Sequence, residues 1–385
     1  MTIRPDYLPF GKPNFSDGEI AAVSRVLRSG WVGMGPETIA FEKELASFLG
    51  APFVVTVNSC TSAMFLSLLV HGVGPGDEVI CPSLTWCSTA NVALFLGATP
   101  VFCDVDPDTL CVTPEMVSEK LSPRTRAVMV VHFGGLPAPV REIGAVLPDG
   151  VAVIEDAAHA LGSRFADGTP VGGSGNLTCF SFYANKNLST GEGGAVALFD
   201  EVFADRLRSL RIHAMPVDAW KRFSSPKVLL KTDLSELGYK MNYTDLQACL
   251  GRVQLARQAE FSVIRLGIAR QYVDFLSSLK PPVRLQEGIL APGHSRHLFV
   301  VQFPTEALGV SRDDLVVLLR DRNVGASIHY APLHRMPLYA GSGPVRPLAV
   351  TDAVCERILT LPFGAGMDRE NADYVITQLR EVLPR

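Results

Sequence analysis

The most constraining feature of this 385-residue sequence is a rhythm that repeats between about residues 50 and 200. Short apolar runs, turn residues and helical patterns follow one another in that order. Such alternation is typical of βαβ units, in which a helix crosses over between two parallel strands. It predicts an α/β fold with a mostly parallel central sheet flanked by helices.

The rhythm also gives the expected elements of this first part of the chain. The expected strands are 53–57, 78–82, 100–104, 126–133, 151–155, 179–183 and 194–199. The expected helices are 16–28, 62–71, 89–96, 113–121 and 138–147. The first of these helices begins at a Ser/Asp cap and ends before a glycine, as amphipathic helices commonly do.

The pattern changes after Pro281 and Pro282, where a long helix expected from Thr244 to about Leu279 is interrupted. Beyond the prolines the sequence predicts strand-like runs at 297–302 and 324–329 and helices at 312–320 and 371–382. This mixture indicates a smaller C-terminal α+β domain. We therefore divide the chain into a large domain with its N-terminal segment, residues 1–255, and a small domain, residues 256–385.

Composition narrows the functional classes. Lysine and arginine number 35 against 39 acidic residues, so the chain has no broad electrostatic footprint for nucleic acid or an anionic membrane. No apolar run reaches the roughly 18 residues of a membrane span, and the N-terminus lacks the apolar core of a signal peptide. The eight cysteines form no C-x-x-C pair and no zinc spacing, which predicts reduced thiols, no metal site and a cytoplasmic protein.

Asp156 follows the strand-like run in VAVIEDAAHALG. In open α/β sheets, ligands bind beyond the carboxyl ends of the strands, so this carboxylate stands where chemistry usually occurs. Aspartate is also a favoured helix cap, and the small residues that follow could begin a helix. Both interpretations are open on spacing alone.

Lys186 lies between two strand-like runs in CFSFYANKNLSTGEGGAV, among Ser, Asn and Gly rather than other charges. Burial there would lower the pKa of the lysine, and a neutral amine is what Schiff-base chemistry requires. An ordinary loop lysine with a solvated amine is the alternative.

Two further segments follow strand-like runs. Residues 58–63 (NSCTSA) open a helix with small polar residues, whose free N–H groups could bind a phosphate, although an ordinary capped helix has the same composition. Trp86 in PSLTWCSTAN could stack on a planar cofactor, or it could be a core tryptophan.

These motifs together carry a family resemblance. Thr61, GPGDEVICPSLTW, LGATPVFCDVDPDTL, EDAAHALG, SFYANKNLSTGEGG, LGYKMNYTDLQACLGRVQL and IHYAPLH occur in this order. The set resembles the DegT/StrS-type nucleotide-sugar aminotransferases, a branch of the fold-type I enzymes that use pyridoxal 5'-phosphate (PLP). The resemblance runs from about Phe10 to Val382, nearly the whole chain.

The resemblance implies roles for the two central residues. Lys186 is expected to hold PLP as a Schiff base and, once freed, to act as general base and acid. Asp156 is expected to keep the pyridine nitrogen protonated, so that the ring accepts charge from the substrate. Trp86 would stack on the ring, and His159 would lie near its phenolic oxygen, where many relatives have Gln. Cys60, Thr61 and Ser181 would bind the phosphate.

The resemblance also implies contacts beyond the cofactor. Asn242 in GYKMNYTD matches an asparagine that relatives donate to the partner subunit's PLP phosphate, which implies a homodimer with shared active sites; a turn asparagine is the alternative. Lys221 and Arg222 could meet the diphosphate of a sugar nucleotide, or they could be solvated surface charges. His329 matches a position near the substrate, or it could be a plain loop histidine.

The resulting expectation is a PLP-dependent aminotransferase that cycles through pyridoxamine 5'-phosphate (PMP). It would move an amino group, by likeness from glutamate, to a keto group at carbon 4 of a nucleotide-activated sugar, with carbon 3 and ketones outside the nucleotide sugars also open. One alternative is a PLP- or PMP-dependent sugar dehydratase, although those relatives carry His at the position of Lys186. The other is a non-catalytic PLP-binding regulator or accessory protein.

Overall fold

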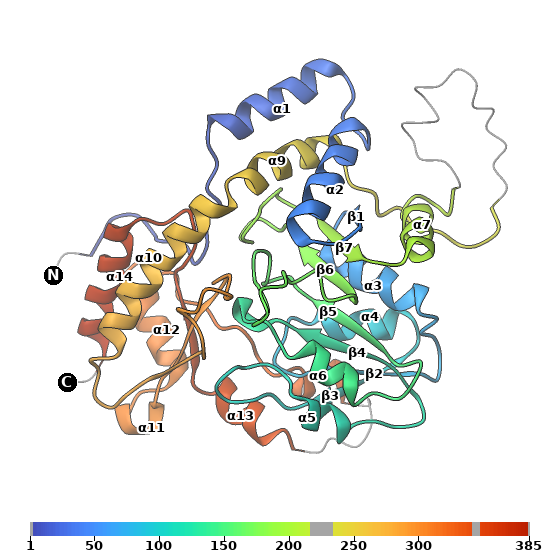
Figure 1. Ribbon diagram of the computed structural model, residues 1–385. Coiled ribbons are helices and arrows are strands. Elements are labelled where there is room, and N and C mark those ends of the chain that lie inside the picture. Colours follow the sequence, from blue (N-terminus) through green and yellow to red (C-terminus); the bar gives the residue numbers. More distant parts are fainter. Residues whose placement is uncertain (1–2, 216–233, 341–346, 384–385) are drawn as a thin grey trace.

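A seven-stranded sheet forms the centre of the computed structural model, which describes residues 3–215, 234–340 and 347–383 (Figure 1). Its strand order is β1-β7-β6-β5-β4-β2-β3. The strands are β1 (Phe53–Val57), β2 (Glu78–Pro82), β3 (Thr99–Cys103), β4 (Thr125–Val131), β5 (Ala152–Asp156), β6 (Leu177–Ser181) and β7 (Gly194–Leu198). Only β7 runs against its neighbours β1 and β6, so the mostly parallel sheet is confirmed.

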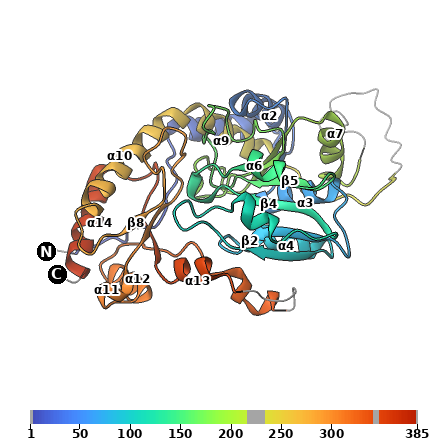
Figure 2. The same ribbon diagram turned by 60° about the horizontal axis from the view of Figure 1, so that its bottom comes forward.

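Helices pack on both faces of this sheet (Figure 2). One face is covered by α3 (Cys60–Val70), α4 (Ser88–Phe95) and α7 (Glu201–Leu210). The other is covered by α2 (Pro36–Leu49), α5 (Pro114–Ser118), α6 (Val140–Ala145) and α9 (Asp245–Ala256). Strands buried on both faces are mostly apolar, which is why they stand out in the sequence as nearly continuous apolar runs.

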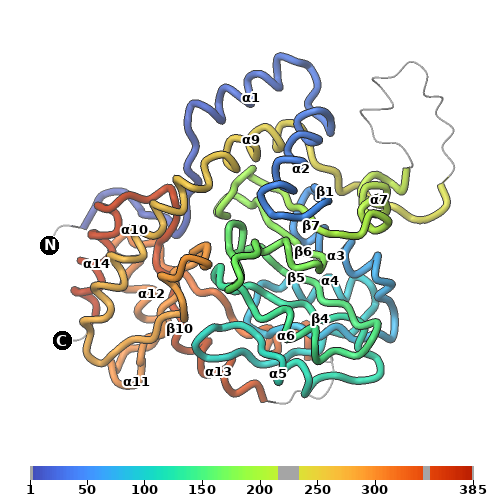
Figure 3. The backbone as a smooth tube through the Cα atoms, in the orientation of Figure 1, coloured from blue at the N-terminus to red at the C-terminus, as the bar shows by residue number. Residues whose placement is uncertain are grey.

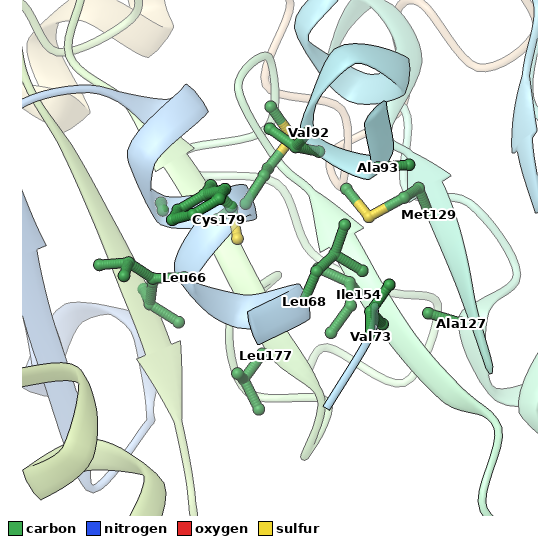
Figure 4. Packing of buried hydrophobic residues seen from close by; sticks show 14 of the residues in the cluster. Leu66, Leu68, Val73, Val92, Ala93, Ala127, Met129, Ile154, Leu177 and Cys179 are labelled. Atoms are coloured by element: carbon green, nitrogen blue, oxygen red, sulfur yellow. The ribbon is translucent and has the colours of Figure 1, made fainter. Parts of the chain in front are cut away.

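The alternation of side chains along β4 illustrates this double burial. Ala127 and Met129 belong to the cluster beneath α3 and α4, whereas Val128 and Val130 belong to the cluster on the opposite face. Figure 4 shows the first cluster, in which side chains of the two helices lie over the strands. A shift of register by one residue would exchange the two sets, so burial fixes the register.

The C-terminal part forms a second, smaller unit, traced in Figure 3. Its antiparallel sheet has the order β10-β9-β8, with β8 (Arg284–Leu285), β9 (Phe299–Gln302) and β10 (Ile358–Leu361). The helices of this unit are α10 (Gln258–Leu276), α11 (Thr305–Leu308), α12 (Arg312–Arg320), α13 (Ala349–Cys355) and α14 (Arg369–Val382). The α+β character of this unit is confirmed, and Leu8 from the start of the chain joins its core.

The small sheet has two apolar faces with different partners. Phe299 and Val301 face the core of the small unit, whereas Leu298, Val300 and Ile358 join the cluster formed by β2, β4 and α6 of the large unit. Because successive side chains of β9 point to opposite faces of the small sheet, this strand packs against the cores of both units.

Two expected elements are wrong. The long helix expected from Thr244 is divided into α9 and α10, because Arg257 leaves the helical conformation with φ −94° and ψ 4°. Its guanidinium donates to Asn14 and Glu19 near the N-terminal helix α1 (Asp17–Ser29). The run at 324–329 is not a strand, because Val324 and Ser327 form single bridges to two different segments, at Leu8 and Thr360. No helix in the described ranges is long and apolar enough to cross a membrane.

Asp245 joins α9 to α2. It is the first residue of α9, and its carboxylate accepts hydrogen bonds from the N–H groups of Gly35, Glu37 and Thr38 at 2.8, 3.2 and 2.9 Å and from the Thr38 hydroxyl at 2.7 Å. Gly35 is the N-cap of α2, so the side chain that begins one helix caps another. The carboxylate also compensates the positive end of the α2 dipole.

We predict that Asp245→Ala lowers the free energy of unfolding by about 2 to 4 kcal/mol, because buried donors lose a charged acceptor. Asp17→Ala is the matched control, since Asp17 is the first residue of α1 but is exposed, and it should cost less than about 1 kcal/mol. The measurement is urea denaturation at one fixed protein concentration. Equal losses for the two variants would contradict the capping role.

Candidate active site

The side chains singled out in the sequence meet at one edge of the large sheet. Strands β1, β2, β5 and β6 run in the same direction, so their carboxyl ends lie at that edge. A cavity of about 480 Å³ opens there. Among the residues that line it are Cys60, Thr61, Trp86, Asp156, His159, Ser181, Lys186 and His329.

Asp156 is the last residue of β5 and is 5% exposed. Its Oδ2 accepts a hydrogen bond from the Thr89 hydroxyl at 2.7 Å, and its Oδ1 accepts one from the N–H of Ala158 at 3.1 Å. The Thr85 hydroxyl lies 2.9 Å from that of Thr89 and can donate to it in turn. No helix starts after Asp156, so the helix-cap alternative is excluded. The hydrogen bonds from Thr89 and Ala158 hold the carboxylate, which lines the cavity.

Lys186 lies in the loop between β6 and β7 and is only partly exposed, at the wall of the cavity. Its Nζ is 3.4 Å from Nε2 of His297. Burial lowers the pKa of Lys186 to about 8, against the opposing attraction of Asp156. The amine is therefore substantially neutral in mildly alkaline solution, unlike the amine of a solvated lysine.

His159 is held in one tautomer by two neighbours. Its Nδ1 accepts a hydrogen bond from the N–H of Gly134 at 3.3 Å, which leaves the proton of the neutral ring on Nε2. Nε2 lies 3.1 Å from the Tyr330 hydroxyl. Burial, together with the positive charge of Lys186, holds the pKa of His159 well below its usual value. The ring is therefore a neutral donor at pH 7.

The N-terminus of α3 forms another wall of the cavity, with Ser59, Cys60 and Thr61. The first N–H groups of a helix have no acceptor within the helix and are available to an anion. Ser59 caps this helix by accepting from the N–H of Ser62 at 3.1 Å. A Cβ atom at Gly194 would lie 2.6 Å from the Cys60 nitrogen, so the glycine is needed for β7 to pass this close.

Trp86 is 60% exposed, an unusual state for a tryptophan, and it lines the cavity. The core interpretation of this residue is therefore wrong. Its ring centroid lies 5.9 Å from that of Tyr330. An exposed aromatic face at the wall of a cavity is suited to stacking on a planar ligand.

The remaining candidates are placed as follows. His329 lines the cavity, and its Nδ1 lies 2.9 Å from the Thr360 hydroxyl. Asn242 does not line the cavity of its own chain; its Nδ2 donates to the Tyr243 carbonyl at 3.1 Å. Lys221 and Arg222 lie outside the described residues.

Three residues of the site were not identified from the sequence: Thr89, His297 and Tyr330. Tyr330 follows His329 in the IHYAPLH motif, so its position in that motif was a usable signal. His297 begins the expected strand at 297–302, but nothing local indicates that it reaches Lys186 from the other unit. Thr89 in α4 follows Thr85 by four residues, and this spacing alone does not indicate that the Thr89 hydroxyl donates to Asp156.

Comparison with known proteins agrees with this geometry. Residues 13–380 match the model of the DegT/DnrJ/EryC1/StrS aminotransferase family. The spore coat polysaccharide biosynthesis protein SpsC of Bacillus subtilis is 40% identical, over 99% of this chain and 98% of that protein. The aminotransferase TlmJ of Streptoalloteichus hindustanus has a crystal structure with TM-score 0.88 and 36% identity, over 97% of this chain and 98% of that one.

A third relative is informative about the cofactor. The PMP form of the putative sugar aminotransferase Spr1654 of Streptococcus pneumoniae has TM-score 0.88 and 29% identity, over 97% of this chain and 98% of that one. Its PLP form has also been solved and matches with TM-score 0.87. The fold and the site therefore define a PLP-dependent aminotransferase. The chain belongs to the DegT/DnrJ/EryC1/StrS aminotransferase family.

We predict that PLP forms an imine with the cofactor-free protein at a rate that rises with pH through a midpoint near about 8, because only the neutral amine of Lys186 reacts. The measurement is the initial rate of the absorbance change between pH 6 and 10. Lys186→Ala gives the background from other lysines, which is subtracted. A midpoint above pH 10 would mean that the reactive amine is solvated.

Proposed function

We propose that this enzyme transfers an amino group from glutamate to a keto group, at carbon 4, of a nucleotide-activated sugar. Family membership and the names of the relatives support a sugar substrate. The observation that carries the proposal is one cavity in which a lysine with a lowered pKa, a buried carboxylate and an exposed tryptophan face the N-terminus of α3.

These residues fit PLP group by group. The N–H groups at the start of α3 with the hydroxyls of Thr61 and Ser181 suit the phosphate, and the exposed face of Trp86 suits the ring. Asp156 suits the pyridine nitrogen, because its carboxylate is fixed by Thr89 and Ala158 yet still lines the cavity. The protonated Nε2 of His159 suits the phenolic oxygen as a hydrogen-bond donor.

Bound PLP supplies a ring that withdraws electrons from the reacting carbon. Lys186 would hold the cofactor through Nζ. The same amine, when free, would take a proton from the substrate and return it, which an amine with a pKa near 8 can do in both directions at cellular pH. Asp156 would maintain the proton on the ring nitrogen of the bound cofactor.

Asn242 supports a shared active site. It is half-buried, lies just before Tyr243, and follows Met241, whose carbonyl accepts a hydrogen bond from Asn58 at the end of β1. We propose that Asn242 reaches the cofactor phosphate of the partner subunit in a homodimer. Lys221, Arg222 and His329 are proposed as contacts of the nucleotide sugar.

We predict that Lys186→Ala abolishes both the visible absorbance of the bound cofactor and amino transfer, because the covalent link and the proton carrier are the same amine. Lys280→Ala, which changes an exposed lysine, serves as the control and should retain both. The assay mixes the enzyme with glutamate and nucleotide ketosugars and measures 2-oxoglutarate and aminosugar in equal amounts. A Lys186→Ala protein that turns over would contradict the proposal.

We predict that Lys186→Ala and Asn242→Ala chains complement each other when they are co-expressed. In a mixed dimer one site contains Lys186 from one chain and Asn242 from the other, and the second site lacks both. Random pairing should therefore give roughly a quarter of the wild-type number of complete sites, more activity than either variant alone. Activity no higher than the average of the two separate variants would mean that Asn242 acts within its own subunit.

A further inference from the structure

A second, much smaller cavity lies on the other side of Lys186. Its volume is about 20 Å³, room for one water molecule or one ion of similar size. Lys186 and Asn185 line both this cavity and the large one, so the loop that holds the lysine separates the two. Arg265 of α10, His297 and Lys12 also line the small cavity.

The charges around this cavity all have one sign. Its charged lining residues are Lys12, Lys186 and Arg265, and no aspartate or glutamate is among the described residues that line it. Arg265 is 3% exposed, and burial together with the nearby Arg296 lowers its pKa to about 9. A buried guanidinium without a counter-charge is costly, and buried charges are normally paired.

The hydrogen bonds of Arg265 are also incomplete. Its Nε donates to the Ser295 carbonyl at 3.0 Å, but its two terminal nitrogens have no acceptor within the part of the chain that the structure describes. The neighbouring Arg296, equally buried, differs in this respect. All three of its guanidinium nitrogens donate to backbone carbonyls, those of Ile289, His294 and Ala291, at 2.9, 2.9 and 2.6 Å.

We propose that this cavity binds one small monovalent anion, of the size and charge of chloride, against the terminal nitrogens of Arg265. The anion supplies the acceptor and the counter-charge that Arg265 lacks. It also lies behind the loop of Lys186, where its negative charge favours the protonated form of the amine and of its Schiff base. The anion site stands on the geometry of Arg265 alone, whereas its effect on Lys186 rests on the proposed function.

The direct test uses bromide, which replaces chloride and is visible by anomalous scattering. Crystals soaked in sodium bromide should show an anomalous peak within hydrogen-bonding distance of the Arg265 terminal nitrogens. A peak absent from this cavity, with electron density of a water molecule only, would overturn the proposal. This result does not depend on whether the enzyme is active.

A solution test measures the thermal stability of the cofactor-free protein in sodium chloride and in sodium gluconate at equal ionic strength. Chloride should raise the melting temperature in a saturable way, because a ligand that binds only the folded state stabilises it. Arg265→Gln should lose the chloride response, and Arg270→Gln, an exposed arginine on the same helix, should keep it. Equal melting temperatures in the two salts would contradict chloride binding.

If Arg265→Gln does not fold, Arg265→Lys keeps the charge but removes the planar guanidinium, and a chloride response weakened at least several-fold is expected. With cofactor bound, chloride should also raise the pH midpoint of the absorbance change of the Schiff base, and the Arg265 variants should reduce this shift. Other titratable groups line the two cavities with Lys186 or act on its charge: Asp156, Cys60, His159, Tyr183, Glu192, His329 and Tyr330 at the large cavity, and Lys12 and His297 beside Arg265 at the small one. They are present in both salts, so a midpoint that moves with chloride reports the anion.

Discussion

The candidate active site depends on the contact between the small unit and the Gly134–Gly135 turn of the large unit. The carbonyl of Gly134 accepts the N–H groups of His297 and Leu298 at 2.9 and 3.2 Å, while its own N–H donates to His159. Both glycines have positive φ, 64° and 104°, and a Cβ atom at Gly134 would lie 2.4 Å from Oε1 of Gln286. This single turn therefore fixes the tautomer of His159 and brings His297 to Lys186, so a larger residue there would disturb docking and chemistry together.

Burial determines which of the titratable side chains near that contact carry a charge. Burial lowers the pKa values of His159 and His297 well below the usual value, and that of His329 to about 3, so these rings stay neutral while Lys186 titrates. A neutral imidazole next to Lys186 neither repels the protonated amine nor competes for its proton. Two carboxylates among the described residues line the large cavity, those of Asp156 and Glu192. The attraction of Asp156 is the one that favours the protonated form of Lys186.

The sequence is informative about this fold where the determinant is local. The strands were predictable because double burial makes them nearly continuous apolar runs, and Asp156, Trp86 and Lys186 were identifiable because they follow strands at one edge of the sheet. The break between α9 and α10 was not predictable, because it is fixed by bonds from Arg257 to residues more than 200 positions earlier. His297 was missed for the same reason, since its role arises only when two units dock.

The central claim is that Lys186 is the residue that carries the cofactor. The most direct measurement is borohydride reduction of the protein reconstituted with PLP, followed by proteolysis and mass spectrometry of the peptides. We expect a single stable pyridoxyl adduct on the peptide that contains Lys186, and its loss when reduction follows incubation with glutamate. An adduct on another lysine, or none on Lys186, would contradict this claim.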